Sequence, residues 1–223
     1  MLALLAPGQG AQTPGMLAAW LELPGAAERL AAWSQISGLD LARLGTTATA
    51  EEITDTAVTQ PLVVAATLLA HEELTRRGLL AGKDTVVAGH SVGEIAAYAI
   101  AGVISADDAV KLAATRGSEM AKACALEPTA TLLSNADGQP VSSATDAMSK
   151  LVSQLTRPVR WDLCTETLRQ QNVTAIVEFP PAGTLAGIAK RELRGVPTHA
   201  VKSPADLDGL AELSGHDSRL AGE

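Results

Sequence analysis

The chain alternates short apolar runs with longer stretches in which apolar residues recur every three or four positions. The short runs are expected to be strands, at residues 2–6, 85–88, 131–134, 174–179 and 199–202. The longer stretches are expected to be helices, at residues 61–77, from about 94, 106–123, 146–155, 162–170 and 183–193. Because apolar strands separated by helices are typical of a parallel sheet covered on both faces, we predict a three-layer α/β fold.

Local signals mark where some of these helices begin and end. Pro61 is expected to open the helix that Gly78 closes, since proline suits the first helical turn and glycine the end of a helix. The sequence SADD at residues 105–108 resembles a capping box and predicts the start of the next helix. We assign residues 1–210 to a single core and residues 211–223 to a frayed tail.

Length and composition fit a globular domain with a sizeable core. Of the 223 residues, 47% are hydrophobic and 19% are charged. The formal net charge of −8 argues against a nucleic-acid or membrane partner, because binding to either needs a basic surface. No stretch is long and apolar enough to cross a membrane. Two cysteines, Cys124 and Cys164, are too few for a disulfide framework, so we expect a cytoplasmic protein.

The sequence Gly-His-Ser-Val-Gly at residues 89–93 lies between a predicted strand and a predicted helix. Such a segment places its serine on a strained turn, like the nucleophile elbow of α/β-hydrolases, and needs glycines where strand and helix pass closely. The Ser91 hydroxyl would stand at the positive end of the helix, where the Val92 N–H can stabilise an oxyanion. The alternative is a glycine- and serine-rich turn without chemistry.

A second oxyanion donor is expected from the loop PGQGAQ at residues 7–12, which follows the first predicted strand. Gln9 stands at its tip. Because parallel strands end at a common edge, this loop and the serine turn are expected to lie together. The loop could instead hold a phosphate group, but it lacks the spacing and the lysine of a phosphate-binding P-loop.

An arginine falls on the apolar face of the helix predicted over residues 106–123. The apolar stripe of this helix contains Ala109, Leu112, Ala113, Met120 and Ala123. Arg116 lies on the same stripe, and an inward guanidinium must meet an anion. The anion is either an internal carboxylate, such as that of Glu94, or a carboxylate of the substrate. Together with a Ser91 nucleophile, the second option predicts a malonyl-type acyl group.

Seven segments, which together span nearly the whole chain, carry a family resemblance. They are PGQGAQ (7–12), TQP (59–61), GHSVGE (89–94), AGV (101–103), RGSEM (116–120), RPVRW (157–161) and VEFPPAGTLAGIAKR (177–191). In this order they resemble the malonyl-CoA:acyl carrier protein transacylases of fatty-acid and polyketide synthesis. The resemblance implies transfer of malonyl from coenzyme A to Ser91, and then to the phosphopantetheine thiol of acyl carrier protein.

The resemblance also implies roles for individual residues. Ser91 would be the nucleophile, the backbone of Gln9 and Val92 the oxyanion hole, and Arg116 the clamp on the malonyl carboxylate. Gln60 and His90 would lie at the substrate pocket. Asn135, in LLSNADG, would match a residue whose backbone carbonyl orients the catalytic histidine. The implied partners are malonyl-CoA and acyl carrier protein, and no cofactor or metal is expected.

One part of the family pattern is absent. In the family, the helix with the arginine is followed by a small ferredoxin-like subdomain and then by a segment that supplies the general-base histidine. Here MAKACALEPTATLLSN runs directly into the next predicted strand, with the seam near residues 125–128. We do not expect His71, His90, His199 or His216 to replace that base, because none is predicted within hydrogen-bond reach of Ser91. Activity is therefore expected to be crippled.

Two other functions remain open. The chain could be a scaffold that binds coenzyme A or acyl carrier protein through Lys190, Arg191 and Arg194, although a basic helix end is also common without any partner. It could also be a hydrolase with a Ser91–Asp137 dyad, as in patatin-like lipases. The Asp137 segment NADG, however, is equally that of a simple turn.

Overall fold

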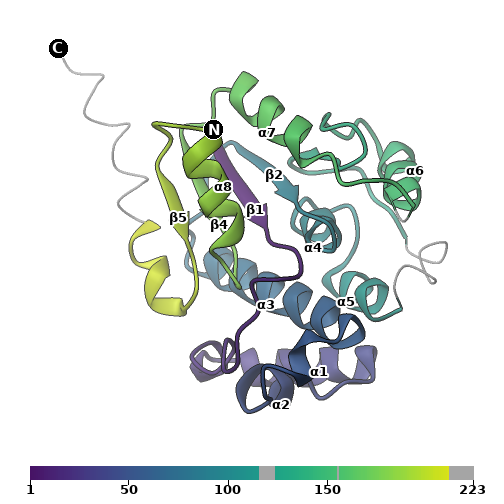
Figure 1. The fold of residues 1–223 in the computed structure, drawn as a ribbon, viewed down its shortest axis with the longest axis vertical. Coiled ribbons are helices and arrows are strands. Elements are labelled where there is room, and N and C mark those ends of the chain that lie inside the picture. Colours follow the sequence, from purple (N-terminus) through teal and green to yellow (C-terminus); the bar gives the residue numbers. More distant parts are fainter. Residues whose placement is uncertain (116–123, 155, 211–223) are drawn as a thin grey trace.

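The computed structural model describes residues 1–115, 124–154 and 156–210 (Figure 1). Its centre is a five-stranded sheet in the order β3-β2-β1-β4-β5, in which all neighbouring strands are parallel. The strands are β1 Leu2–Ala6, β2 Thr85–Gly89, β3 Thr131–Leu133, β4 Ala175–Glu178 and β5 Thr198–Ala200. The predicted parallel α/β sheet is confirmed, and each strand lies within two residues of its predicted bounds.

Helices connect the strands. They are α1 Ala26–Ser37, α2 Leu41–Thr46, α3 Thr56–Arg76, α4 Gly93–Ile100, α5 Ala106–Ala114, α6 Ala144–Gln154, α7 Trp161–Gln170 and α8 Thr184–Glu192, with 3-10 turns at Trp20–Glu22, Glu52–Thr54 and Pro204–Leu207. The predicted continuation of α5 over residues 116–123 and the predicted tail lie outside the described residues. Within the described ranges, no helix combines the length and the apolarity that a membrane span requires.

The longest helix, α3, begins earlier than predicted. It starts at Thr56, five residues before Pro61, because the Asp55 side chain accepts the N–H of Ala57 and caps the helix. Pro61 therefore lies inside the helix, where its missing N–H removes one helical hydrogen bond. Gly78 follows the end of the helix with a φ of 69°, as its predicted closing role requires. Neither α1 nor α2 is among the predicted helices.

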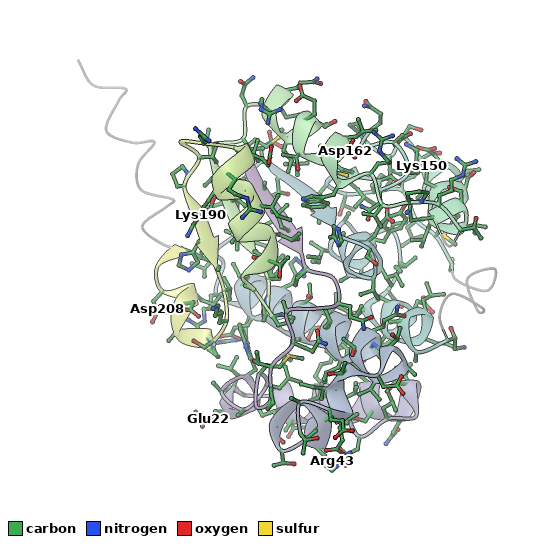
Figure 2. All side chains as sticks on the ribbon, viewed as in Figure 1. Glu22, Arg43, Lys150, Asp162, Lys190 and Asp208 are labelled. Carbon is green, nitrogen blue, oxygen red and sulfur yellow. The ribbon has the colours of Figure 1, made fainter. Side chains whose placement is uncertain are left out.

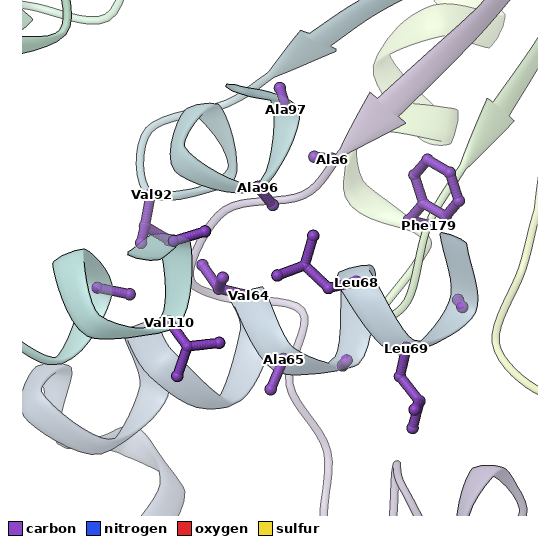
Figure 3. Packing of buried hydrophobic residues seen from close by; sticks show 14 of the residues in the cluster. Ala6, Val64, Ala65, Leu68, Leu69, Val92, Ala96, Ala97, Val110 and Phe179 are labelled. Carbon is purple, nitrogen blue, oxygen red and sulfur yellow. The ribbon is translucent and has the colours of Figure 1, made fainter. Parts of the chain in front are cut away.

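The sheet sends alternate side chains into two separate cores. In β1, Leu4 packs into the larger core with α3, α4 and α5, whereas Leu5 packs into the smaller core with α7 and α8. Figure 3 shows the larger core, in which Ala6 of β1 and Ala96 of α4 lie above Leu68 of α3. Helices therefore cover both faces of the sheet, and the predicted three layers are confirmed.

α1 packs against α3 and α5 and contributes Leu30 and Trp33 to the larger core. The Trp33 indole N–H donates to Oδ1 of Asp107 over 3.0 Å. The Arg29 guanidinium lies 4.5 Å above the Trp33 ring and pairs with Glu72 of α3 at 2.9 Å. These contacts fix α1 on α3 and α5.

Candidate active site

Ser91 stands on a strained turn between β2 and α4. Its φ is +56°, a left-handed conformation that among the described non-glycine residues only Asn172 shares. The residue is exposed and comes directly before Val92, the N-cap of α4. This strain is typical of a nucleophile elbow, so the predicted backbone geometry at Ser91 is present.

The glycines around the elbow are required by close backbone approach. A Cβ on Gly89 would come well within 3.0 Å of the Gly93 carbonyl, and one on Gly93 equally close to the Ala6 carbonyl. A Cβ on Gly8 would lie 2.6 Å from the His90 carbonyl oxygen, so the loop after β1 packs directly against the elbow. The predicted reason for both flanking glycines is confirmed, and the two predicted loops do lie together.

Two backbone amides are open, one in the elbow and one in the loop that packs against it. The N–H groups of Gly93, Glu94 and Ile95 donate to carbonyls of the turn itself. The N–H groups of Val92 and Gln9, by contrast, have no acceptor among the residues that the structure describes. These are the two amides that the sequence assigns to the oxyanion hole, and that assignment stays a prediction.

The loop after β1 also contacts the first turn of α3. The Gln9 side-chain amide donates to the Thr56 hydroxyl over 3.4 Å. Gln60 lies one helical turn further along α3 and is half-buried. The structure therefore brings Gln9 and Gln60 to the same end of α3, beside the elbow. Arg116 lies outside the described residues, so neither of its two predicted anions is placed.

No described side chain shares a hydrogen bond with the Ser91 hydroxyl. The neighbouring His90 does not approach it as a base would. Its ring meets the Trp161 ring edge-on, with the ring centroids 5.5 Å apart. Burial lowers the pKa of His90, which keeps the imidazole neutral near pH 7. The position of His90 agrees with the expectation that it is not the base for Ser91.

The other histidines are engaged elsewhere. His71 lies in α3 against the edge of Phe179, and burial lowers its pKa to about 4. His199 belongs to the edge strand β5, separated from β2 by two strands, and its Nε2 lies 2.6 Å from the carbonyl oxygen of Asp206. His216 lies outside the described residues. Over the described ranges, then, no histidine is hydrogen-bonded to Ser91.

Asp137 has the contacts of a turn residue. Its Oδ1 accepts the N–H of Gln139 over 3.0 Å, and its Oδ2 lies 3.2 Å from Nζ of Lys150. Both carboxylate oxygens are thus engaged, and among the described contacts none joins Asp137 to Ser91. The structure favours the turn interpretation of NADG over a Ser91–Asp137 dyad.

Asn135 touches the elbow through its side chain, which sequence reasoning missed. Its Oδ1 accepts the N–H of Ser91 over 2.9 Å, and its Nδ2 donates to the carbonyl of Gly89 over 2.6 Å. Its backbone carbonyl, the group expected to orient a histidine, accepts the N–H of Arg160 over 2.9 Å. No sequence signal marks the side-chain contact, because it depends on β3 lying beside β2.

Glu94 is buried beneath the elbow and turns toward β3. Its Oε1 accepts the N–H of Asn135 over 2.7 Å and the Ser134 hydroxyl over 3.0 Å. Its Oε2 has no hydrogen-bond partner in the described part of the chain. Burial raises the pKa of Glu94 to about 7, so this carboxyl is partly protonated near neutral pH.

Basic residues cluster at the end of α8. Lys190 and Arg191 occupy its last turn, and Lys190 lies at the outside of the molecule in Figure 2. Cations at a helix C-terminus are stabilised by the helix dipole without any partner. This explanation is sufficient for the two residues, and a docking role for them stays a prediction.

A pocket of about 280 Å³ opens on the other side of β1 from the elbow. It lies between the loops that follow β1 and β4, and its lining includes Thr13, Met16, Pro181 and Lys202, but not Ser91. The sequence does not predict it. Among the described residues, no group of three or more His, Cys, Asp or Glu side chains is placed to hold a metal ion.

Comparison with known proteins adds a family. The acyl transferase domain family matches residues 4–170. The malonyl CoA-acyl carrier protein transacylase of Mycobacterium tuberculosis is 56% identical over 302 residues, covering 96% of this chain and 100% of that protein. The protein of the same name from Escherichia coli is 33% identical over 214 residues, covering 94% of this chain and 68% of that protein. The crystal structure of MCAT from Mycobacterium tuberculosis has a TM-score of 0.90 and 55% identity, covering 94% and 99%.

The alignment with the mycobacterial protein is longer than the chain itself. It spans 302 residues, whereas the chain has 223, so at least 79 of its positions face a gap in this chain. The coverage of 96% of this chain and 100% of the relative places most of that gap inside the alignment. The chain therefore lacks a substantial internal segment of this relative.

Proposed function

Because the chain belongs to the acyl transferase domain family, and within it to the malonyl-CoA:acyl carrier protein transacylases, we propose that it moves a malonyl group from coenzyme A to an acyl carrier protein. The observation that carries this proposal is Ser91. It is an exposed serine at φ +56° that stands beside an open amide at the start of α4. The free thiols of Cys124 and Cys164 support a reducing, cytoplasmic location.

The transfer has two balanced halves. In the first, the Ser91 oxygen attacks the thioester carbonyl, the carbon–sulfur bond breaks, and coenzyme A leaves as a thiol with the serine proton. In the second, the phosphopantetheine thiol attacks the malonyl ester, the carbon–oxygen bond breaks, and the thiol proton returns to Ser91. Each half passes through an oxyanion, which the N–H groups of Val92 and Gln9 would stabilise. Arg116 would hold the malonyl carboxylate.

Proton transfer is the weak point of this chemistry. The Ser91 hydroxyl has no side-chain partner among the described residues, and the alignment gap of at least 79 positions leaves room for the missing histidine segment. Without a general base, an elbow and an oxyanion hole retain only part of the rate enhancement. We therefore propose slow acylation of Ser91 rather than efficient turnover.

The test is the acylation of Ser91 by malonyl-CoA, followed over time by mass spectrometry of the intact chain. We expect a slowly formed single malonyl adduct that is absent in Ser91→Ala. Added imidazole should speed up its formation by supplying the missing base. An adduct of equal size on Ser91→Ala would overturn the role of Ser91. Rapid labelling that imidazole does not accelerate would contradict the proposal that the chain lacks a general base.

A further inference from the structure

A network of hydrogen bonds around Asn135 and Glu94 supports the elbow. The Asn135 side chain bonds both to the Ser91 N–H and to the Gly89 carbonyl, which belong to the two peptide groups on either side of His90, directly before Ser91. The Asn135 backbone N–H then donates to Glu94, which lies in the first turn of the helix that the elbow opens. This network therefore joins the end of β2, the elbow, α4 and the end of β3.

The orientation of the Asn135 amide is fixed by chemistry. The Ser91 N–H can only donate and the Gly89 carbonyl can only accept, so Oδ1 must face the first and Nδ2 the second. Asn135 is fully buried, and so is Ser134, which donates its hydroxyl to Glu94. Removing the side chain therefore leaves the Gly89 carbonyl without its buried partner.

A left-handed serine persists only where its surroundings determine its backbone conformation. The glycines remove steric conflict around Ser91 but do not themselves hold it in place. In the described structure, Asn135 is the one side chain that hydrogen-bonds to the Ser91 N–H, and it also holds the Gly89 carbonyl at the end of β2. It is therefore placed to set the direction in which the Ser91 hydroxyl emerges.

We propose that Asn135 is a positioning residue for acyl transfer, whose side-chain amide holds the serine turn in its reactive geometry, and that Glu94 holds Asn135 in turn. The proposal rests on the proposed function, because it assumes that Ser91 is the nucleophile. It concerns the side chain of Asn135 and assigns no role to its backbone carbonyl.

Asn135→Ala should lower the maximal rate of Ser91 acylation by malonyl-CoA by roughly a hundredfold, as small displacements of a reacting group do. The malonyl-CoA concentration at half-maximal rate should change little, since Asn135 touches the turn and not the substrate. Glu94→Ala should slow acylation in the same way. Glu94→Gln should rescue it, because glutamine keeps an oxygen for the Asn135 N–H and the Ser134 hydroxyl.

Thr67→Val is the matched control. It likewise removes buried side-chain hydrogen bonding, here the one bond from the Thr67 hydroxyl to the Pro180 carbonyl over 2.9 Å, but away from the elbow. We expect this variant to lose thermal stability and to keep the wild-type acylation rate per folded molecule. Wild-type acylation in Asn135→Ala, or an equal loss of rate in Thr67→Val, would overturn the proposal.

A fluorophosphonate probe separates this proposal from the proposed function, because it reports the reactivity of the serine without malonyl-CoA. Labelling of wild-type Ser91 that is lost in Asn135→Ala supports the positioning role even if malonyl-CoA does not react. In that case only the proposal that malonyl-CoA is the substrate is contradicted. Equal labelling of the two proteins, or labelling of neither, overturns the positioning role.

Discussion

The strands on either side of β1 lead into helices whose first amides are used differently. After β4, the buried carboxylate of Glu178 accepts the N–H groups of Gly183, Leu185 and Ala186 at 2.8 Å, 2.9 Å and 2.8 Å. The positive end of α8 is therefore neutralised by a group of the protein itself. Burial raises the pKa of Glu178, and the three N–H bonds counteract that shift.

After β2, no carboxylate of the described chain caps the helix. Glu94 lies in the first turn of α4, but it accepts from Ser134 and Asn135, which directly follow the neighbouring strand β3. The Val92 N–H has no acceptor in the described structure. Equivalent positions in one sheet can therefore serve either the structure or the chemistry. At the junction between β4 and α8, a carboxylate of the protein accepts the first N–H groups of the helix. At the junction between β2 and α4, the Val92 N–H stays available for the negative charge of a bound substrate.

The largest effect is expected from Gly93→Ala at the α4 junction. The new Cβ would collide with the carbonyl oxygens of Ala6 and Pro7, neither of which can yield like a flexible side chain. We expect a loss of about 5 kcal/mol or more in the free energy of unfolding, measured with urea, and loss of Ser91 acylation.

Gly187→Ala in α8 is the control for this substitution. The nearest atom to a Cβ there, an Arg191 nitrogen, is 3.9 Å away. Alanine is the better helix former, so this variant should gain about 0.5–1 kcal/mol. A Gly93→Ala protein with wild-type stability and acylation would contradict the close packing of the elbow.

The next effect concerns Glu178, at the junction between β4 and α8. Glu178→Ala leaves three N–H groups, two of them buried, without their acceptor and should cost about 3–5 kcal/mol of unfolding free energy. Glu178→Gln keeps one oxygen and should cost about half of that. The acylation rate of Ser91 per folded molecule should not change in either variant, because α8 does not form the elbow. A reduced rate per folded molecule in Glu178→Gln would show that the two junctions are coupled.

The smallest effect is a pH dependence at Glu94. Burial raises its pKa from 4.5 to about 7, so within this range the folded protein binds a proton that the unfolded chain releases. The stability linked to this group is full below pH 4.5 and is lost as the pH rises toward about 7. Glu94→Gln cannot ionise, so its unfolding free energy relative to wild type should rise by roughly 3 kcal/mol across this window.

Urea titrations of both proteins at about pH 5 and about pH 8 measure this change, since the two values lie on either side of most of the window. The difference between the two proteins is the relevant quantity, because other carboxyl groups titrate in both. A difference that is the same at both pH values would contradict the raised pKa.

The fold is largely readable from the sequence because four of its five strands are mostly buried on both faces. The run at residues 2–6 is apolar throughout, and β1 has these same bounds. The pattern also contains a missed signal. Ala26, Leu30 and Trp33 are the buried residues of α1, and their spacing of four and three is that of one helical face. For α3, the cap at Asp55 outweighs the start that Pro61 indicates.

Only those parts of the site that lie close together in the sequence could be predicted from it. The glycines, Ser91 and the open Val92 amide follow from one strand-turn-helix segment, so the sequence can indicate them. Asn135 lies 44 residues beyond Ser91, and its contact exists only because β3 pairs with β2. Strand order depends on how whole layers pack, and a run of residues does not encode it locally.

The central place of β1 in the sheet determines when the fold can form. Leu2 pairs with Thr85 on one side and with Ala175 on the other, so the first strand made is completed by one of the last. At synthesis rates of about 5–20 residues per second, this apolar strand waits for seconds without its second neighbour. Such distant pairing slows folding, and it makes the newborn chain dependent on protection from aggregation until β4 has left the ribosome.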